Sequence, residues 1–188
     1  MKAKTMLSNR HVHLSKEDVA LLFGREDALT PRRDIGGEYV SNENVEVIGP
    51  KGSVICYVIF GEHRNFTQVE LLRSDNYTLG INAPVRKSGN KDGLAHVIVK
   101  GPVGQIEGDL AMLAWRHIHV GSKNLEGTPF EGKKYCRLRA EGDRGLTFDH
   151  VLIEAYPGAS FEPFCHIDAE EGNAALISNG DILEMIPE

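Results

Sequence analysis

The sequence predicts a mainly β fold, and three observations carry this prediction. Segments rich in β-branched and aromatic residues recur along the chain, and such residues favour strands. Gly-Pro, Pro-Gly and Asn-Gly pairs, which are typical of turns, separate several of these segments. Segments with helical signals are few and short. Short strands joined by turns indicate a barrel or a sandwich rather than a parallel α/β sheet.

Seven strands and three helices are expected. The strands, in chain order, are 45–48, 53–60, 67–73, 96–100, 135–140, 146–156 and 181–186. Ser15 is a helix cap, so a helix is expected over 16–23, with Gly24 ending it. Asp168 opens a capping-box pattern, DAEE, for a helix that runs to Ser178. Ser122 is expected to cap the third helix.

Length and composition limit the classes of protein. The chain has 188 residues, of which 41% are hydrophobic and 26% charged, so it suits one elaborate domain or two small ones. Its longest apolar run, 54–60, is too short to cross a membrane, and no secretory signal is recognisable. The net charge of −6 argues against a general nucleic-acid or membrane binder. Three cysteines without a CxxC pair are expected to be reduced thiols of a cytosolic protein.

A weak internal echo predicts two related halves. RHVHLS at 10–15 returns as RHIHVG at 116–121, so each half would open with a His-x-His strand. GPKGSV at 49–54 is also echoed by GPVGQI at 101–106. Coincidence competes with a repeat as the explanation of this second echo, because Gly-Pro turns are common.

The two His-x-His pairs are candidate metal sites. Side chains at i and i+2 of a strand point to one face, so His11 and His13 would present two imidazoles together, as would His117 and His119. The alternative is a pair of polar residues on an exposed strand face. Two such pairs after the same arginine favour the metal site.

His166 and Glu70 are the candidates for completing these sites. His166 precedes a predicted helix, while Cys165 alternates to the opposite face and is expected to be a core thiol. Glu70 would point away from Val69 and Leu71, and a glutamate paired with an arginine is its alternative interpretation. Three protein ligands and an open position would suit catalytic zinc, although iron, nickel and copper also accept imidazole. The remaining histidines, His63, His96 and His150, are interpreted as surface or satisfied polar residues.

Arg64 and Arg86 are candidates for binding an anion. A guanidinium group is the usual bidentate partner of phosphate or carboxylate. A solvated surface arginine is the alternative for each. The chain contains no P-loop, no GxGxxG before a helix and no GxSxG elbow, so a kinase, a nucleotide dehydrogenase and a serine hydrolase are poorly supported.

These residues lie in motifs that resemble the PduL-type phosphotransacylases, the phosphate propanoyltransferases of the propanediol-utilisation type. The matching stretches run the whole length: SNRHVHLSKED, LTP, GPKGS, TQVE, LGINAPVRKSG, RHIHV, RGLTFD and HIDAEEGNAAL. The resemblance implies two small β-barrels capped by short α-helices, with an active site holding two zinc ions between them. It also implies reversible transfer of an acyl group, propanoyl or acetyl, from coenzyme A to phosphate.

The resemblance also assigns roles to individual residues. Its zinc ligands fall on His11, His13, Glu70, His117, His119 and His166. The sequence leaves open which ligands share an ion, and the division we expect is His11, His13 and Glu70 on one ion and the three other histidines on the second. Its phosphate-binding, catalytic arginine falls on Arg64. Its coenzyme A pocket falls on Ser8, Arg33, His166 and Asn173. Val58 and Phe60 stand where the resemblance implies an arginine and a leucine, and Arg86 or Lys87 is the candidate to compensate for the missing positive charge.

Further expectations concern organisation and partners. Residues 10–113 and 114–188 would form the two barrel halves, with 1–9 a candidate for pairing across them. A homodimer is expected. Its expected location is the cytoplasm, either free or within a bacterial microcompartment, although no encapsulation segment is recognisable before RHVH. Two rival functions stay open: a metal-dependent acyl-CoA hydrolase or cupin-like metalloenzyme, and a non-catalytic protein with structural zinc.

Overall fold

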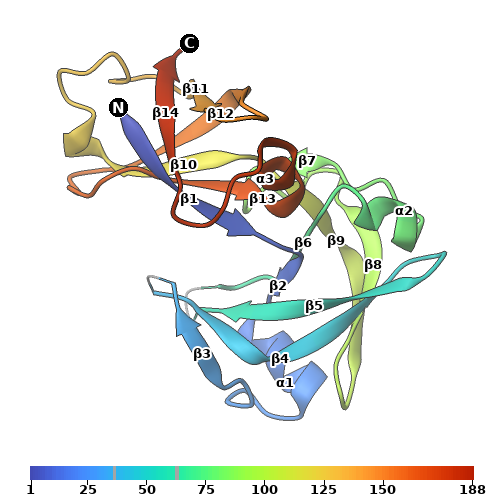
Figure 1. Cartoon of the computed structure of the whole chain (residues 1–188). Helices are drawn as coiled ribbons and strands as arrows, with labels where there is room; N and C mark the ends of the chain where they lie inside the picture. The colour runs from blue at the N-terminus through green and yellow to red at the C-terminus, as the bar shows by residue number, and fades with distance from the viewer. Residues whose placement is uncertain (36, 62–63) are drawn as a thin grey trace. The chain divides into compact units, whose positions relative to one another are not determined.

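The structure, a computed structural model, describes residues 1–35, 37–61 and 64–188, which form two compact units. The terminal unit comprises Met1–Asn9 and Trp115–Glu188, and the central unit comprises Arg10–Ala114. Figure 1 labels the elements of both. Of the residues named above, His63 lies outside the described residues. Within the described part, no helix is both long and apolar enough to span a bilayer.

The terminal unit is a closed six-stranded barrel with the order β1-β13-β10-β12-β11-β14 (Figure 1). Strand β1 pairs in parallel with β13 and antiparallel with β14, which closes the ring. Two short helical segments accompany it, the 3₁₀ turn η1 (Ser122–Asn124) and α3 (Ala169–Ala175). The strands are β1 (Lys2–Ser8), β10 (His117–Gly121), β11 (Tyr135–Ala140), β12 (Leu146–Tyr156), β13 (Phe164–Asp168) and β14 (Ile182–Pro187).

The central unit contains a second ring of six strands, β4-β5-β2-β6-β9-β8, in which β8 pairs with both β9 and β4. Two further strands lie outside the ring, β3 paired with β4 and β7 paired with β9. The strands are β2 (His11–His13), β3 (Pro31–Asp34), β4 (Tyr39–Ile48), β5 (Ser53–Phe60), β6 (Gln68–Leu71), β7 (Val85–Arg86), β8 (Ala95–Lys100) and β9 (Gln105–Ala114). The helices are α1 (Lys16–Phe23) and α2 (Asp75–Leu79). The prediction of a mainly β protein with two small barrels and short helices is therefore confirmed.

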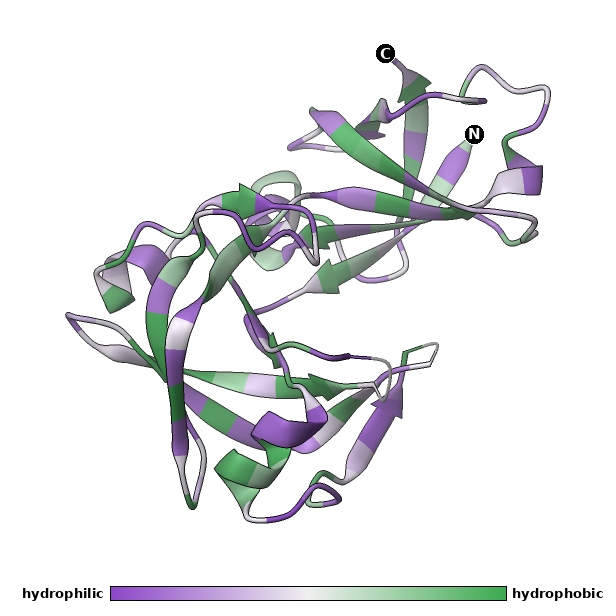
Figure 2. Cartoon of the chain, turned by 180° about the vertical axis from the view of Figure 1, so that it is seen from behind, coloured by the Kyte–Doolittle hydropathy of each residue, from purple (hydrophilic) through white to green (hydrophobic). Residues whose placement is uncertain are grey.

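Each barrel has its own hydrophobic core. Val12, Val58 and Val69 are fully buried in the central unit, and Ile118 and Cys165 are fully buried in the terminal unit. The strands show alternating hydrophobic and hydrophilic bands, which is the period-2 pattern of a sheet with one face inside (Figure 2). The residues that alternate with these core residues, including the histidines of β2 and β10, therefore point to the other face of each strand.

The two barrels share one pairing scheme. Strand β2 pairs in parallel with β5 and antiparallel with β6, as β10 pairs with β12 and β13. Strands β4, β8 and β9 correspond in the same way to β11, β14 and β1. The echo extends to MLSNRHVH at 6–13 and MLAWRHIH at 112–119, which span β1–β2 and β9–β10. At both places the chain leaves one barrel and enters the other, so the repeat is a duplicated barrel with exchanged strands.

The Gly-Pro echo has a different origin, because both hairpins lie in the central unit. The Lys51 amide donates to the Leu79 carbonyl of α2 at 3.0 Å, and the Val103 amide donates to the Leu22 carbonyl of α1 at 3.1 Å. A Cβ on Gly101 would lie 2.4 Å from that Leu22 oxygen, so the hairpin requires glycine there. The Gly-Pro echo therefore reflects two hairpins that each donate a backbone hydrogen bond to the C-terminal end of a helix, and it does not reflect the barrel repeat.

The expected helices are confirmed in one case and corrected in two. Helix α1 begins and ends as predicted, with the Ser15 side chain accepting from the Asp18 amide. Helix α3 has the predicted capping box at Asp168, but it ends at Leu176, which adopts a left-handed conformation at φ 56°. The extension to Ser178 is wrong because the chain turns there to bury Ile177.

Ser122 does not cap a helix. Gly121 precedes the short η1 turn and makes no side-chain cap, while the Ser122 hydroxyl accepts from the Gly158 amide at 2.9 Å. Ser122 instead joins η1 to the turn that follows β12, so its polar side chain serves a long-range contact.

Candidate functional site

The central unit brings together His11, His13 and Glu70. His11 and His13 come from β2, and Glu70 lies directly opposite His11 on the antiparallel strand β6. The two Nε2 atoms are 3.2 Å apart, and the Glu70 carboxylate oxygens lie 3.4 Å and 3.6 Å from them. All three side chains are almost completely buried, and the Tyr57 ring stacks on His11 at 5.4 Å.

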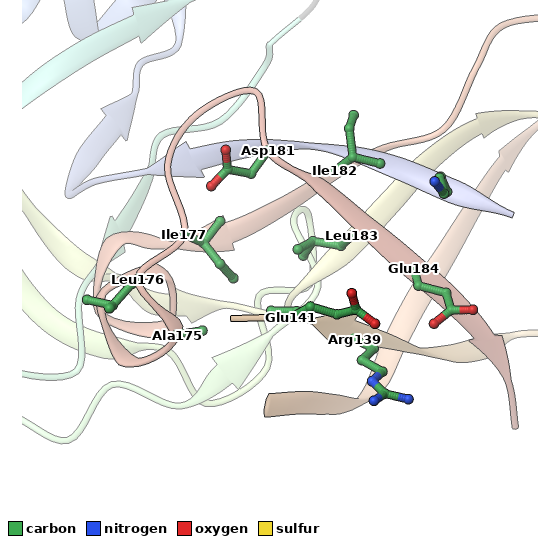
Figure 3. A pocket seen from close by; sticks show the side chains of 11 residues that line it. Arg139, Glu141, Ala175, Leu176, Ile177, Asp181, Ile182, Leu183 and Glu184 are labelled. Carbon is green, nitrogen blue, oxygen red and sulfur yellow. The ribbon is translucent and has the colours of Figure 1, made fainter. Parts of the chain in front are cut away.

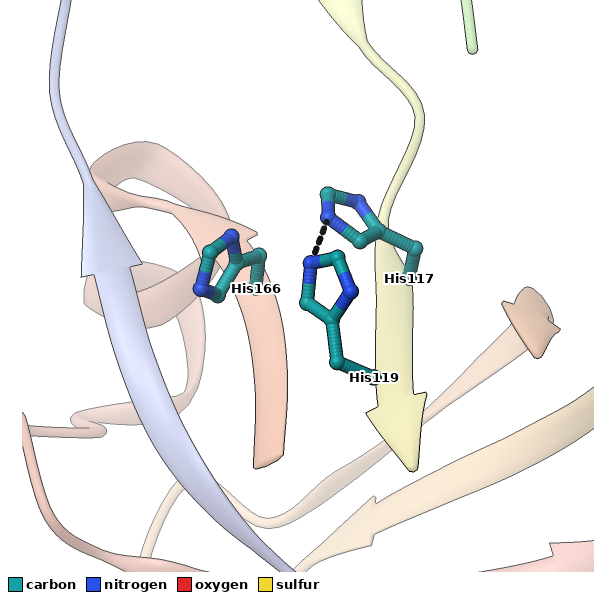
Figure 4. Close-up of side chains that lie close together, drawn as sticks. All are labelled: His117, His119 and His166. Carbon is teal, nitrogen blue, oxygen red and sulfur yellow. Dashed lines mark hydrogen bonds between the residues drawn. The ribbon is translucent and has the colours of Figure 1, made fainter. Parts of the chain in front are cut away.

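The terminal unit brings together His117, His119 and His166 (Figure 4). His117 and His119 come from β10, and His166 lies opposite His117 on the antiparallel strand β13. The Nε2 atoms of His117 and His119 are 3.0 Å apart, and the His166 ring centroid lies 5.0 Å from each of their rings. The third member thus occupies the same register position in both barrels, as a glutamate in one and a histidine in the other.

The donor atoms in each cluster fit a transition metal. The ligand atoms of each cluster lie within 4.8 Å of one another. Two nitrogens bound to one tetrahedral zinc ion at 2.0–2.1 Å are about 3.3 Å apart, close to the spacing of both Nε2 pairs. His117 Nδ1 lies 2.8 Å from the Trp115 carbonyl oxygen, which can only accept, so we assign the proton to Nδ1 and a lone pair to Nε2. The structure thus presents two sites that could each hold zinc or a similar ion.

The central cluster is part of a ring of polar contacts that includes Arg64. The Gln68 amide nitrogen donates to Glu70 Oε1 at 2.7 Å and to the Ser88 hydroxyl at 3.2 Å. Arg64 Nη1 lies 3.5 Å from the same hydroxyl, and its Nε donates to Glu38 at 2.8 Å. The other Glu38 oxygen lies 3.7 Å from His13 Nδ1. Arg64 is therefore two contacts from His13, through Glu38, and three contacts from Glu70, through Ser88 and Gln68.

Three members of this ring were not found from the sequence. Glu38, Gln68 and Ser88 carry no recognisable motif of their own, although Ser88 lies inside the LGINAPVRKSG stretch. Gln68 carried the one available signal, because it lies in the TQVE stretch two residues before the candidate ligand Glu70. The structure shows that it is fully buried on β6.

The other predicted binding residues are distributed over both units. Arg86 donates to the carbonyls of Val85 and Asp92, so its guanidinium is engaged by its own loop. Arg33 is exposed on β3 of the central unit. In the terminal unit, Ser8 ends β1 opposite Asp168, and Asn173 is exposed on α3, the helix that follows the His166 strand.

Val58, where the resemblance led us to expect an arginine, is fully buried in the core of the central barrel. Its side chain is therefore a packing residue of this chain.

The cysteines are core thiols. Cys165 is fully buried, as expected, and burial raises its pKa. Burial also raises the pKa values of Cys56 and Cys136 to about 12. A thiol serves as a nucleophile in its thiolate form, so these side chains are unsuited to covalent catalysis.

Two further histidines are surface residues with acidic partners. His96 lies 3.0 Å from Glu107 and from Asp109, and its pKa is raised by hydrogen bonds to both. His150 lies 3.1 Å from Glu188. The interpretation of these two as surface or satisfied histidines is confirmed.

A separate cavity of about 480 Å³ lies in the terminal unit beside β14 and the end of α3 (Figure 3). Its lining mixes exposed apolar side chains, Leu176 and Ile182, with charged ones such as Lys2 and Arg139. It contains neither a cluster histidine nor a predicted binding residue.

Comparisons with known proteins identify the family of the chain. A family model described as phosphate propanoyltransferase matches residues 4–178. A phosphate propanoyltransferase of Clostridioides difficile is 40% identical over 95% of this chain and 86% of its own length. Those of Thermotoga maritima and Limosilactobacillus reuteri are 38% and 35% identical, over 96% and 93% of this chain and 87% and 82% of their own lengths. The chain therefore belongs to the phosphate propanoyltransferase family of phosphotransacylase enzymes.

Proposed function

We propose that this protein transfers a propanoyl group reversibly between coenzyme A and inorganic phosphate, with acetyl as a second substrate and one zinc ion in each histidine cluster. Family membership supports the reaction type. The observation that carries the proposal is the presence of two three-ligand clusters together with Arg64, which is joined to one of them through Glu38 on one side and through Ser88 and Gln68 on the other.

The reaction requires one bond exchange. A phosphate oxygen attacks the thioester carbonyl carbon, a C–O bond forms, the C–S bond breaks and the coenzyme A thiolate leaves. Zinc, when bound, supplies a Lewis acid that stabilises developing negative charge. Direct attack by phosphate needs no protein nucleophile, which agrees with the burial of the Cys165 thiol.

Arg64 is the residue proposed to bind phosphate. Its side chain is about 15% exposed and is held by the Glu38 carboxylate, an anion that phosphate would replace as its partner. Gln68 holds Glu70 in orientation through its 2.7 Å hydrogen bond. Ser8, Arg33, His166 and Asn173 are proposed to contact coenzyme A on the strength of the family resemblance, with Arg86 as an additional positive charge. The homodimer and the microcompartment association stay predictions.

The test measures thioester formation from propanoyl phosphate and coenzyme A. Chelator-stripped protein is compared with the same sample after zinc is restored, and activity should disappear and return. Arg64→Ala should raise the KM for phosphate in the reverse reaction about 10- to 100-fold, the loss of a charged hydrogen bond. Arg73→Ala is the matched control, because Arg73 is exposed and packs on Tyr77.

Two outcomes would overturn the proposal. Propanoyl-CoA consumption that is independent of phosphate would identify a metal-dependent hydrolase. Bound zinc without any turnover would favour a structural role for the metal.

A further inference from the structure

The arginine before the central His-x-His strand is bound to the helix that follows the third ligand. Arg10 Nε donates to both oxygens of Asp75 at 2.9 Å and 3.0 Å, and Arg10 Nη2 lies 2.9 Å from Oδ1. Asp75 is the first residue of α2, and its side chain is 2% exposed. It also accepts from the Leu72 amide at 2.9 Å, so this carboxylate ties the end of β6 to the start of β2.

The terminal unit contains the corresponding arginine–carboxylate pair, joined by one nitrogen–oxygen contact. Arg116 Nε lies 3.2 Å from Glu171 on α3, and its guanidinium packs over the Phe148 ring at 5.6 Å. Glu171 also accepts from the Asp168 amide in the capping box. Arg116 is thereby attached to the helix that directly follows the His166 strand.

The spacing is identical in the two barrels. Each arginine directly precedes the first histidine of its pair, and each acidic partner lies five residues after the third cluster member, Glu70 to Asp75 and His166 to Glu171. The third member and the acid both differ in type between the units, yet the connection is the same. Because the arginine–carboxylate pair is present although both of these residue types differ, we relate it to the geometry of the cluster and not to one local sequence.

Strand pairing alone provides few bonds to hold the ligands. Strand β2 has three residues and pairs with β6 through three register positions, while β10 pairs with β13 through three. In the central unit Arg10 contacts both oxygens of Asp75, and such a bidentate contact restricts both distance and angle. In the terminal unit Arg116 makes a single contact with Glu171. The contact lies at the end of each ligand pair where the histidine strand begins.

We propose that Arg10 and Arg116 are positioning residues that hold the third metal ligand of each cluster against its His-x-His strand. The inference rests on the proposed metal sites. Outer contacts that orient ligands commonly change metal affinity 10- to 100-fold when removed. Each arginine should therefore control the affinity of the site in its own unit and leave the other site unchanged.

The experiment measures zinc affinity site by site, by competition with a chromogenic chelator. His117→Ala leaves the central site to be read alone, and His11→Ala leaves the terminal site. In the first background Arg10→Gln should weaken zinc binding about 10-fold or more, and Arg116→Gln should change it less than about twofold. The second background should give the reverse pattern.

A conservative variant and two controls accompany this measurement. Arg10→Lys should recover part of the affinity, because lysine restores the charge without the bidentate geometry. Lys16→Gln, which removes an exposed ion pair with Glu26, and Arg137→Gln, which removes a bond to the Pro187 carbonyl, should leave both affinities unchanged.

Three results would overturn the inference. Unchanged zinc affinity with a lowered unfolding midpoint of the zinc-free protein would make the contact a folding element only. Equal losses at both sites from one substitution would contradict a local role. Failure of both single-site backgrounds to bind zinc would leave no ligand set to position. Zinc binding at both sites without acyl transfer to phosphate would instead overturn the proposed function and leave this inference standing.

Discussion

At the scale of single residues, the side chains of each candidate metal cluster are oriented by neighbouring residues. The Trp115 carbonyl sets the tautomer of His117, Glu38 lies beside His13, and Gln68 binds Glu70. Such contacts hold a ligand in one rotamer and so reduce the entropy lost when the metal binds. Gln68 is the most constrained of them, because its carbonyl also accepts from the Gly89 amide at 2.9 Å.

Gln68→Ala should therefore weaken the central site. Glu70 loses its donor, and the affinity for zinc at that site should fall about 10- to 100-fold. The Gly89 amide loses its acceptor, which should also lower the free energy of unfolding by about 1–3 kcal/mol. Chelator competition in the His117→Ala background measures the first effect, and urea unfolding of the zinc-free protein measures the second.

Asn90→Ala is the matched control for this prediction. Asn90 belongs to the same loop, but its exposed side chain accepts only from the Asp92 amide among the hydrogen bonds found for it. Zinc affinity should be unchanged. A Gln68 variant that loses stability and keeps its zinc affinity would show that Gln68 supports the loop and not the ligand.

The grouping of the candidate ligands could be predicted from the sequence, and their partners could not. His11 and His13 are two residues apart in one strand, so local periodicity places them together. Glu38 and Arg64 are 26 residues apart and meet only when β4 and the segment before β6 are in place. Their contact depends on the register of the barrel, which no local pattern contains.

At the scale of elements, predictions succeeded where a segment carries its own signal. Helix α1 has a serine cap and a terminal glycine, and both of its ends were predicted. Helix α2 has five residues and Ser74 makes no side-chain cap, so it carried no signal and was missed. The end of α3 depends on a left-handed leucine, which is unusual for a side chain with a Cβ. Helix ends of this kind are determined by tertiary packing and not by a local sequence pattern.

The hairpin between β8 and β9 offers a prediction at this scale. A Cβ on Gly101 would lie 2.4 Å from the Leu22 oxygen and 2.7 Å from the Leu22 Cβ, so the hairpin would have to move away from α1. Gly101→Ala should lower the free energy of unfolding by about 1–3 kcal/mol, the usual cost of overpacking. The midpoint of urea unfolding measures this loss.

Gly108→Ala in β9 is the control for the hairpin. The nearest atom to its Cβ would be in Leu110 at 3.8 Å, an ordinary contact, so the expected change is within about 0.5 kcal/mol. Equal losses for the two variants would mean that glycine flexibility, and not the approach to Leu22, determines the cost.

At the scale of the whole molecule, the duplicated barrel explains the placement of both sites. The strand pairs β2–β6 and β10–β13 are equivalent, so duplication copied a His-x-His strand and the opposing position together. The RHVH and RHIH echo in the sequence identified the repeated His-x-His strand. The opposing position could not be recognised as repeated, because it is Glu70 in one barrel and His166 in the other.

Each site draws all its ligands from a single unit, so zinc should stabilise the two units separately. A ligand that binds only the folded state adds about 2.7 kcal/mol when its free concentration is 100 times Kd. For a protein of this size that corresponds to a rise in Tm of about 5–11 °C. Thermal unfolding of chelator-stripped and zinc-restored protein should show this difference.

His117→Ala should remove the zinc-dependent stabilisation of the terminal unit and retain that of the central unit, as followed by hydrogen exchange in β10 and β2. His96→Ala, a substitution outside both clusters, should retain both. Loss of protection in both units from His117→Ala alone would show that the two sites form one cooperative structure instead of two independent ones.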